Sequence, residues 1–254
     1  MESVNEITDS RAATNALLAD LREARFAPPA VARFLTHAAH RSLRQAALRP
    51  EALAQLTALH GLMLAAATGR RPGRRWVATS WALAALHLGL LEHRTRLTAA
   101  DALTLIRASL PAVPGGGSRW SGMPAIALDV ADGRIARRTG TASPFGDYAD
   151  TFADAAFWMW LIWRHEPSRT IRAAALAAWA LPVVTLTALA MRRGTMPERP
   201  RPAVLRPAAA MQAVVAFRHL TRRRHPSVAP RRLPARRAPA CPPRVRPART
   251  PHGP

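Results

Sequence analysis

Residues 129–154 read DVADGRIARRTGTASPFGDYADTFAD, a stretch rich in aspartate. Its regularly spaced aspartates form two pairs, Asp129 with Asp132 and Asp150 with Asp154. Residues three or four positions apart share one face of a helix, so each pair occupies a single face. The letters TGTASP between the pairs contain a Gly and a Pro, which interrupt helices. The stretch therefore predicts two helices joined by a short turn, with two carboxylates from each helix facing one another.

These carboxylates predict a metal site. Like charges raise one another's pKa, so four adjacent carboxylates need a counter-charge. Divalent cations held by oxygen ligands are the usual solution. Five of the chain's 15 acidic residues lie in this stretch, and all five are Asp. A solvated acidic face explains a single Asp well, but it does not explain the whole spacing. The fifth, Asp147, lies outside both pairs and is expected in a solvated loop.

The stretch resembles the signature of the CDP-alcohol phosphatidyltransferase family, D-x2-D-G-x2-A-R-x8-G-x3-D-x3-D, with every gap of the right length. The fixed positions are filled by Asp129, Asp132, Gly133, Ala136, Arg137, Gly146, Asp150 and Asp154. Ahead of it, LTAADALTLIR at residues 97–107 is similar to the family's lead-in to its first core helix. The resemblance covers residues 97–220.

The resemblance implies an activity in phospholipid biosynthesis. A substituted phosphate is transferred from a CDP-alcohol, usually CDP-diacylglycerol, to the hydroxyl of an acceptor alcohol, and CMP is released. By the family pattern Asp129, Asp132 and Asp150 are metal ligands. Asp154 is expected at a second ion and as the general base toward the acceptor hydroxyl. Two Mg²⁺ ions are expected, with Mn²⁺ as a substitute, because Mg²⁺ prefers a few carboxylates together with phosphate oxygens.

Small residues in the signature predict where the nucleotide lies. Gly133 and Ala136 leave one helix face open, so a nucleotide can approach the backbone there. Gly146 does the same at the start of the second helix. Arg137 is suited to a forked contact with two phosphate oxygens. Together with Asp132, these residues form the predicted nucleotide site.

Apolar runs bounded by arginine clusters predict the fold class. Buried helices of a soluble all-α protein also give runs of this length. The longest runs nevertheless approach the ~20 residues that a helix needs to cross a bilayer, and tryptophans lie near their ends, as they often do at membrane interfaces. We predict an all-α, polytopic membrane helical bundle of about five to six apolar helices. The runs cover residues 52–68, 76–91, 155–163, 170–191 and 208–217.

Composition divides the chain into four regions. Residues 1–50 form an amphipathic region, either a basic helix on a membrane surface or two helices packed on each other. Residues 51–96 add apolar helices, and residues 97–220 form the phosphatidyltransferase-like membrane domain. Residues 221–254 contain ten Arg, nine Pro and no acidic residue, a composition typical of a disordered tail. Pro111 and the glycines at 115–117 predict a short helix pair that turns at the glycines, ahead of Asp129.

Composition also limits the alternatives. The single cysteine, Cys241, excludes an internal disulfide framework and a multi-Cys metal site. All 37 basic residues are Arg, and the formal net charge is +22. Two rival functions stay open: a catalytically impaired family member that binds a membrane or a partner protein, and a basic helical nucleic-acid-binding protein. The expected partners are CDP-diacylglycerol, an acceptor alcohol, membrane lipids and a second copy of the chain, whereas nucleic acid is not expected. The expected location is the cell membrane, multi-pass, with the active site facing the cytoplasm.

Overall fold

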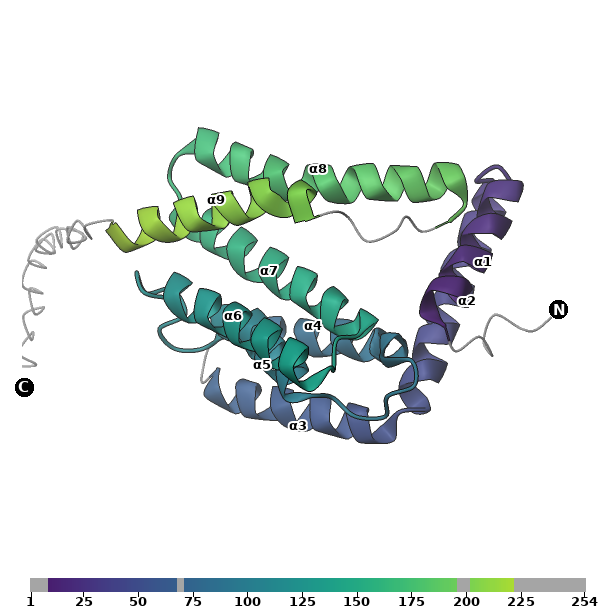
Figure 1. Cartoon of the computed structure of the whole chain (residues 1–254), viewed down its shortest axis with the longest axis horizontal. Coiled ribbons are helices and arrows are strands. Elements are labelled where there is room, and N and C mark those ends of the chain that lie inside the picture. Colours follow the sequence, from purple (N-terminus) through teal and green to yellow (C-terminus); the bar gives the residue numbers. More distant parts are fainter. Residues whose placement is uncertain (1–8, 68–70, 196–201, 222–254) are drawn as a thin grey trace, which may run out of the picture. The chain divides into compact units, whose positions relative to one another are not determined.

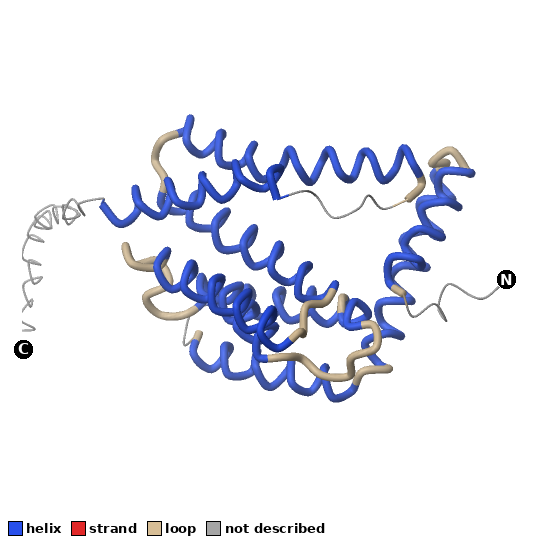
Figure 2. The backbone as a smooth tube through the Cα atoms, viewed as in Figure 1, coloured by secondary structure: helices blue, strands red, loops and turns tan. Residues whose placement is uncertain are grey.

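The computed structural model describes residues 9–67, 71–195 and 202–221, and within these ranges the chain is helical and has no strand (Figure 2). The all-α prediction is confirmed. All but the first residue of the predicted disordered tail lies outside the described residues. The described α-helices are α1 (Ser10–Glu23), α2 (Pro28–Ala47), α3 (Pro50–Ala66), α4 (Arg71–Leu86), α5 (Ala99–Ser109), α6 (Gly122–Thr139), α7 (Pro144–His165), α8 (Arg169–Arg193) and α9 (Pro202–Thr221), with short 3-10 helices η1 (Leu88–Leu91) and η2 (Leu110–Ala112).

The predicted pair of helices joined by a short turn is confirmed as α6 and α7. Helix α6 ends at Gly140, whose φ of 64° lies in the left-handed region that glycine adopts without strain. Ser143 then caps α7, because its side-chain oxygen accepts a 3.1 Å hydrogen bond from the Gly146 amide. Pro144 follows as the first residue of α7, where its missing N–H costs no hydrogen bond.

Helix α5 packs against both α6 and α7 (Figure 1). It begins with a capping box: the Thr98 amide donates to the Asp101 carboxylate over 2.8 Å, and the Asp101 amide donates to the Thr98 hydroxyl over 3.2 Å. After η2 the chain turns through Gly115, at a φ of 82°, and enters α6. The expected short helix pair turning at the glycines is confirmed.

Helix α7 connects two apolar clusters. Near its start, Phe145 and Ala149 pack with residues of α2 to α5 and η1. Further along, Phe157 and Trp158 pack with residues of α6, α8 and α9. Full burial of each large apolar side chain stabilises the fold by about 1.5–3 kcal/mol. The second aspartate pair lies on α7 between these clusters and is therefore held from both sides.

Among the described helices, only α8 is long and apolar enough to cross a membrane. Its best window has a mean hydropathy of 1.9, and only 11% of that window is buried. Leu181, Val183 and Val184 expose 54–61% of their surface. Helices α3 and α4 coincide with two of the predicted apolar runs but have only 17 and 16 residues. The bundle of five to six membrane-spanning helices thus stays a prediction.

The described N-terminal residues are packed helices. Helices α1 and α2 contact each other, and Leu17, Leu18 and Leu21 of α1 are buried. Arg22 donates a 3.0 Å hydrogen bond to the backbone carbonyl of Arg193, at the end of α8. Of the two alternatives for this region, mutual packing describes α1. The described residues up to 221 belong to one compact unit.

Candidate active site

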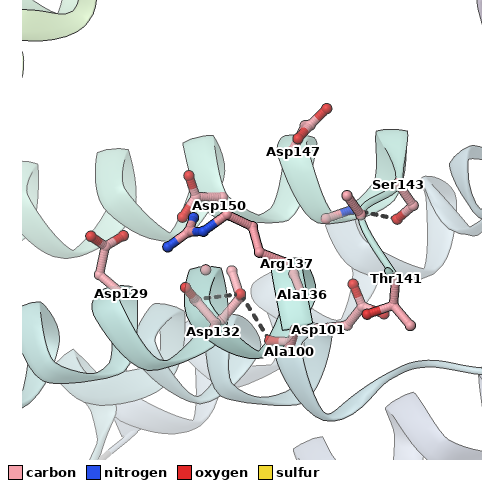
Figure 3. Close-up of a pocket in the computed structure, with 14 residues that line it drawn as sticks. Ala100, Asp101, Asp129, Asp132, Ala136, Arg137, Thr141, Ser143, Asp147 and Asp150 are labelled. Carbon is pink, nitrogen blue, oxygen red and sulfur yellow. Dashed lines mark hydrogen bonds between the residues drawn. The ribbon is translucent and has the colours of Figure 1, made fainter. Parts of the chain in front are cut away.

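The two arms bring three of the four paired aspartates together. Asp129 and Asp132 lie on α6, and Asp150 lies opposite them on α7 (Figure 3). Each of the three offers a carboxylate oxygen, and these oxygens lie within 4.8 Å of one another. The side chain of Asp132 is only 6% exposed, whereas those of Asp129 and Asp150 are 45% and 49% exposed. Asp132 is therefore buried in the protein, whereas Asp129 and Asp150 are accessible to solvent.

One arginine is the counter-charge of all four aspartates. Arg107 of α5 is fully buried. Its Nη1 donates a hydrogen bond to Asp129 and lies 3.7 Å from Asp132 Oδ2. Its Nη2 donates to Asp150 and lies 3.4 Å from Asp154 Oδ1. A buried guanidinium needs acidic partners, and the carboxylates need a cation, so the five groups stabilise one another.

Arg107 was not predicted as a site residue from the sequence, where it is the last residue of the segment at residues 97–107. Asp101, Thr104 and Arg107 are three positions apart, and this spacing places them on one face of α5. Thr104 donates a 2.7 Å hydrogen bond to Asp132 Oδ2. Polar residues at helical spacing within an apolar segment were the signal for this third side of the site.

A further contact comes from α9. Gln212 donates a 2.8 Å hydrogen bond from Nε2 to Asp154 Oδ2. The two residues are 58 positions apart in the sequence, so local spacing does not reveal the contact. A single Gln within the apolar run at 208–217 was the only indication.

The predicted nucleotide-site residues line one cavity of about 350 Å³. The cavity lies between α5, α6, the turn before α7 and the start of α7 (Figure 3). Three of the four aspartates share it, whereas Asp154 lines a different cavity. Its lining residues are Ala100, Asp101, Thr104, Asp129, Asp132, Gly133, Ala136, Arg137, Thr141, Ala142, Ser143, Gly146, Asp147 and Asp150.

Two details of this cavity differ from expectation. Gly133 lines the cavity, but part of its helix face is occupied, because a Cβ there would lie 3.1 Å from Nη1 of Arg137. Glycine at this position therefore makes room for the arginine side chain, which extends toward Asp150 (Figure 3). Asp147 is exposed as predicted, but it lies in the first turn of α7 and not in a loop. The physical reason is that Ser143 and Pro144 start the helix before it.

The three clustered aspartates fit a divalent cation. Carboxylate oxygens are the hard ligands that Mg²⁺ and Mn²⁺ prefer. Arg107 contacts one oxygen of each carboxylate, and an ionised carboxylate has about four acceptor sites on two oxygens. A cation and the guanidinium can therefore share the same three side chains.

Comparison with known proteins supports the resemblance. The sequence model of the CDP-alcohol phosphatidyltransferase family matches residues 120–226. No curated protein and no solved structure matches the chain. The family transfers phosphatidyl groups in phospholipid synthesis, is generally dependent on divalent metal ions and is embedded in membranes. The match begins just ahead of α6 and spans both arms and α9. With the signature complete and its aspartates gathered around Arg107, residues 120–226 of this chain are similar to the CDP-alcohol phosphatidyltransferase family.

Proposed function

We propose that this protein is an enzyme of phospholipid synthesis that transfers a substituted phosphate from a CDP-alcohol, such as CDP-diacylglycerol, to the hydroxyl of an acceptor alcohol. One observation carries the proposal. Two helix arms bring Asp129, Asp132 and Asp150 to the wall of a cavity that the other nucleotide-site residues also line. A solvated acidic surface needs no such cavity.

The cavity suits a nucleotide diphosphate. Arg137 is a planar, forked donor for phosphate oxygens. Asp132, buried and bonded to Thr104, is the fixed member of the metal-ligand set, and Asp129 and Asp150 complete it. Bound Mg²⁺ or Mn²⁺ would neutralise the pyrophosphate beside these carboxylates and polarise the phosphorus that is attacked.

The transfer is a substitution at the phosphorus that carries the donor alcohol. Asp154 accepts the proton of the acceptor hydroxyl, and a new P–O bond forms to that oxygen. The pyrophosphate P–O bond breaks, and its electron pair leaves with CMP. Gln212 holds Asp154 by one carboxylate oxygen, so the other oxygen faces Arg107 and the reaction centre.

The same proposal includes a membrane location. A lipid-linked donor is reached from the bilayer surface, and α8 supplies one helix of suitable length and exposure. We place the protein in the cell membrane as a multi-pass protein, with its active site on the cytoplasmic side.

The test is CMP release by the full-length protein with CDP-diacylglycerol and a panel of alcohols. Asp150→Asn and Asp154→Asn should each reduce CMP release by about 100-fold or more. Asp20→Asn, an identical change at an exposed position of α1, should not. If a folded sample releases no CMP with any acceptor, the chain is an impaired family member and the proposal is wrong.

A further inference from the structure

A second cavity, of about 170 Å³, also borders the aspartate cluster. Three helices form it: α6, α7 and α9. Asp129 lines both cavities, so the two meet at the aspartate cluster. The residues around the second cavity are Ala125, Ile126, Asp129, Asp154, Trp158, Ala209, Gln212 and Ala213.

From this arrangement we infer that the second cavity is the acceptor subsite, and that it takes a small alcohol carrying no phosphate or other anionic group. The inference rests on the proposed function. Asp154, the proposed base, lines this cavity and not the nucleotide cavity. An acceptor hydroxyl placed here lies beside its proposed base, and Asp129 joins this cavity to the proposed nucleotide cavity.

The side chains that line this cavity do not suit an anionic acceptor. Asp129 and Asp154 are both acidic, and none of the described lining residues is Arg, Lys or His. Arg107 lies 3.4 Å from Asp154, but it is fully buried and already shared among four carboxylates. A phosphate on the acceptor would therefore find no basic side chain in this wall to bind it.

The polar groups instead favour a ligand that donates hydrogen bonds. The two carboxylates are acceptors, and Gln212 commits an N–H to Asp154. Hydroxyl and ammonium groups can satisfy such acceptors. The remaining wall is apolar, with three alanines, Ile126 and Trp158, and it suits the carbon chain of a short polyol or amino alcohol.

Helix α9 is held firmly enough to define this wall. Arg218 donates 3.1 and 3.2 Å hydrogen bonds to the carboxylate of Glu166, beyond the end of α7. His219 lies 2.9 Å from the backbone carbonyl of Ser118. Near the same end, a Cβ on Gly122 of α6 would lie 3.2 Å from the Ala216 Cβ. These contacts fix the position of Gln212 relative to Asp154.

The first experiment compares acceptors. Full-length protein with CDP-diacylglycerol and Mg²⁺ is given glycerol, ethanolamine, choline, glycerol 3-phosphate or inositol phosphate, and CMP release is measured. We expect at least one of the first three to be used about tenfold or more faster than either phosphate ester. The neutral and cationic members show which non-anionic alcohol is preferred. Faster use of a phosphate ester would overturn the inference and leave the proposed function standing.

A matched pair of variants then tests the cavity. Ala213 lines it, whereas Ala210 lies on the same helix, is exposed and does not line it. Ala213→Leu should raise the acceptor KM about tenfold or more, with the KM for CDP-diacylglycerol unchanged. Ala210→Leu should change neither. Equal effects of the two variants on the acceptor KM would contradict the assignment.

A binding measurement distinguishes failure of the proposed function from failure of the acceptor-subsite inference. If no acceptor supports CMP release, the proposed function fails, and calorimetric titration with ethanolamine, glycerol and glycerol 3-phosphate decides the inference. Binding of a non-anionic alcohol that is lost in Ala213→Leu and kept in Ala210→Leu would support the subsite. Absence of such binding, or tighter binding of glycerol 3-phosphate, would overturn it.

Discussion

Arg107 of α5 lies 3.4 Å from Asp154 of α7, and the same guanidinium also contacts the other three signature aspartates. One buried side chain from outside the signature is therefore the common partner of all its acidic residues. Removal of one partner from a buried ion network leaves charge uncompensated.

Arg107→Met should destabilise the metal-free protein by about 3 kcal/mol, at the low end for a buried pair because two of the carboxylates are half exposed. Added Mg²⁺ should raise Tm more in this variant than in the wild type, since the cation supplies the missing charge. Thermal unfolding with EDTA and with Mg²⁺ measures both effects. Arg96→Met removes an exposed pair with Glu51 and should change Tm little. The same Tm for both variants in EDTA would refute the role of Arg107.

Thr104→Val should weaken metal binding about tenfold to 100-fold, because Thr104 orients Asp132 through a 2.7 Å hydrogen bond. Titration of Mn²⁺ followed by electron paramagnetic resonance measures the affinity without any turnover. Thr151→Val is the matched control, since this exposed hydroxyl of α7 bonds the Asp147 carbonyl of its own helix. Unchanged affinity in Thr104→Val would show that Asp132 needs no such support.

Gly133→Ala should raise the KM for CDP-diacylglycerol about tenfold, because the new methyl group displaces the Arg137 guanidinium from which a phosphate contact is expected. Gly61→Ala in α3 meets no atom within 4 Å. That control should keep the same KM and gain about 1 kcal/mol of stability from helix propensity. Kinetics and thermal unfolding of both variants check the pair. A KM increase in both would mean that the effect is not local to Arg137.

Val184→Arg should reduce membrane integration, since an arginine near the centre of a crossing helix costs about 2.5–3.5 kcal/mol. Val184 is 61% exposed on α8. Leu43→Arg makes a comparable change at a 62% exposed position of α2 and should have no effect. The measurement is the fraction of protein left in carbonate-washed membranes. Retention of both variants at the wild-type level would show that α8 does not cross the bilayer.

The sequence predicted the two acidic arms because their determinants are local. Spacings of three and four residues define a helix face, and Gly140 and Pro144 mark where one helix stops and the next begins. The residues of the nucleotide cavity follow from the same arms. Seven of the eight signature residues line one cavity, and the local sequence pattern was sufficient to predict that they lie together.

The partners of those residues could not be predicted in the same way. Arg107 and Gln212 reach the aspartates from α5 and α9, and their contacts depend on how separate helices pack. Hydropathy located the apolar helices but did not determine which of them cross a bilayer. In α3, for example, Leu56 is fully buried against other helices, whereas Leu62 is 67% exposed. An apolar sequence run looks the same whether its side chains pack against other helices or face a bilayer.

The attachment of α7 to an apolar cluster at each end has a consequence for motion during turnover. A shift of Asp150 or Asp154 would disrupt the packing around Phe145 or around Trp158. We therefore expect α7 to keep its position during turnover. Helices α6 and α9 contribute Ala125 and Val215 to the second cluster, so they are held against the same arm. We therefore expect the spacing between the carboxylates of Asp150 and Asp154 to stay nearly constant when substrate binds.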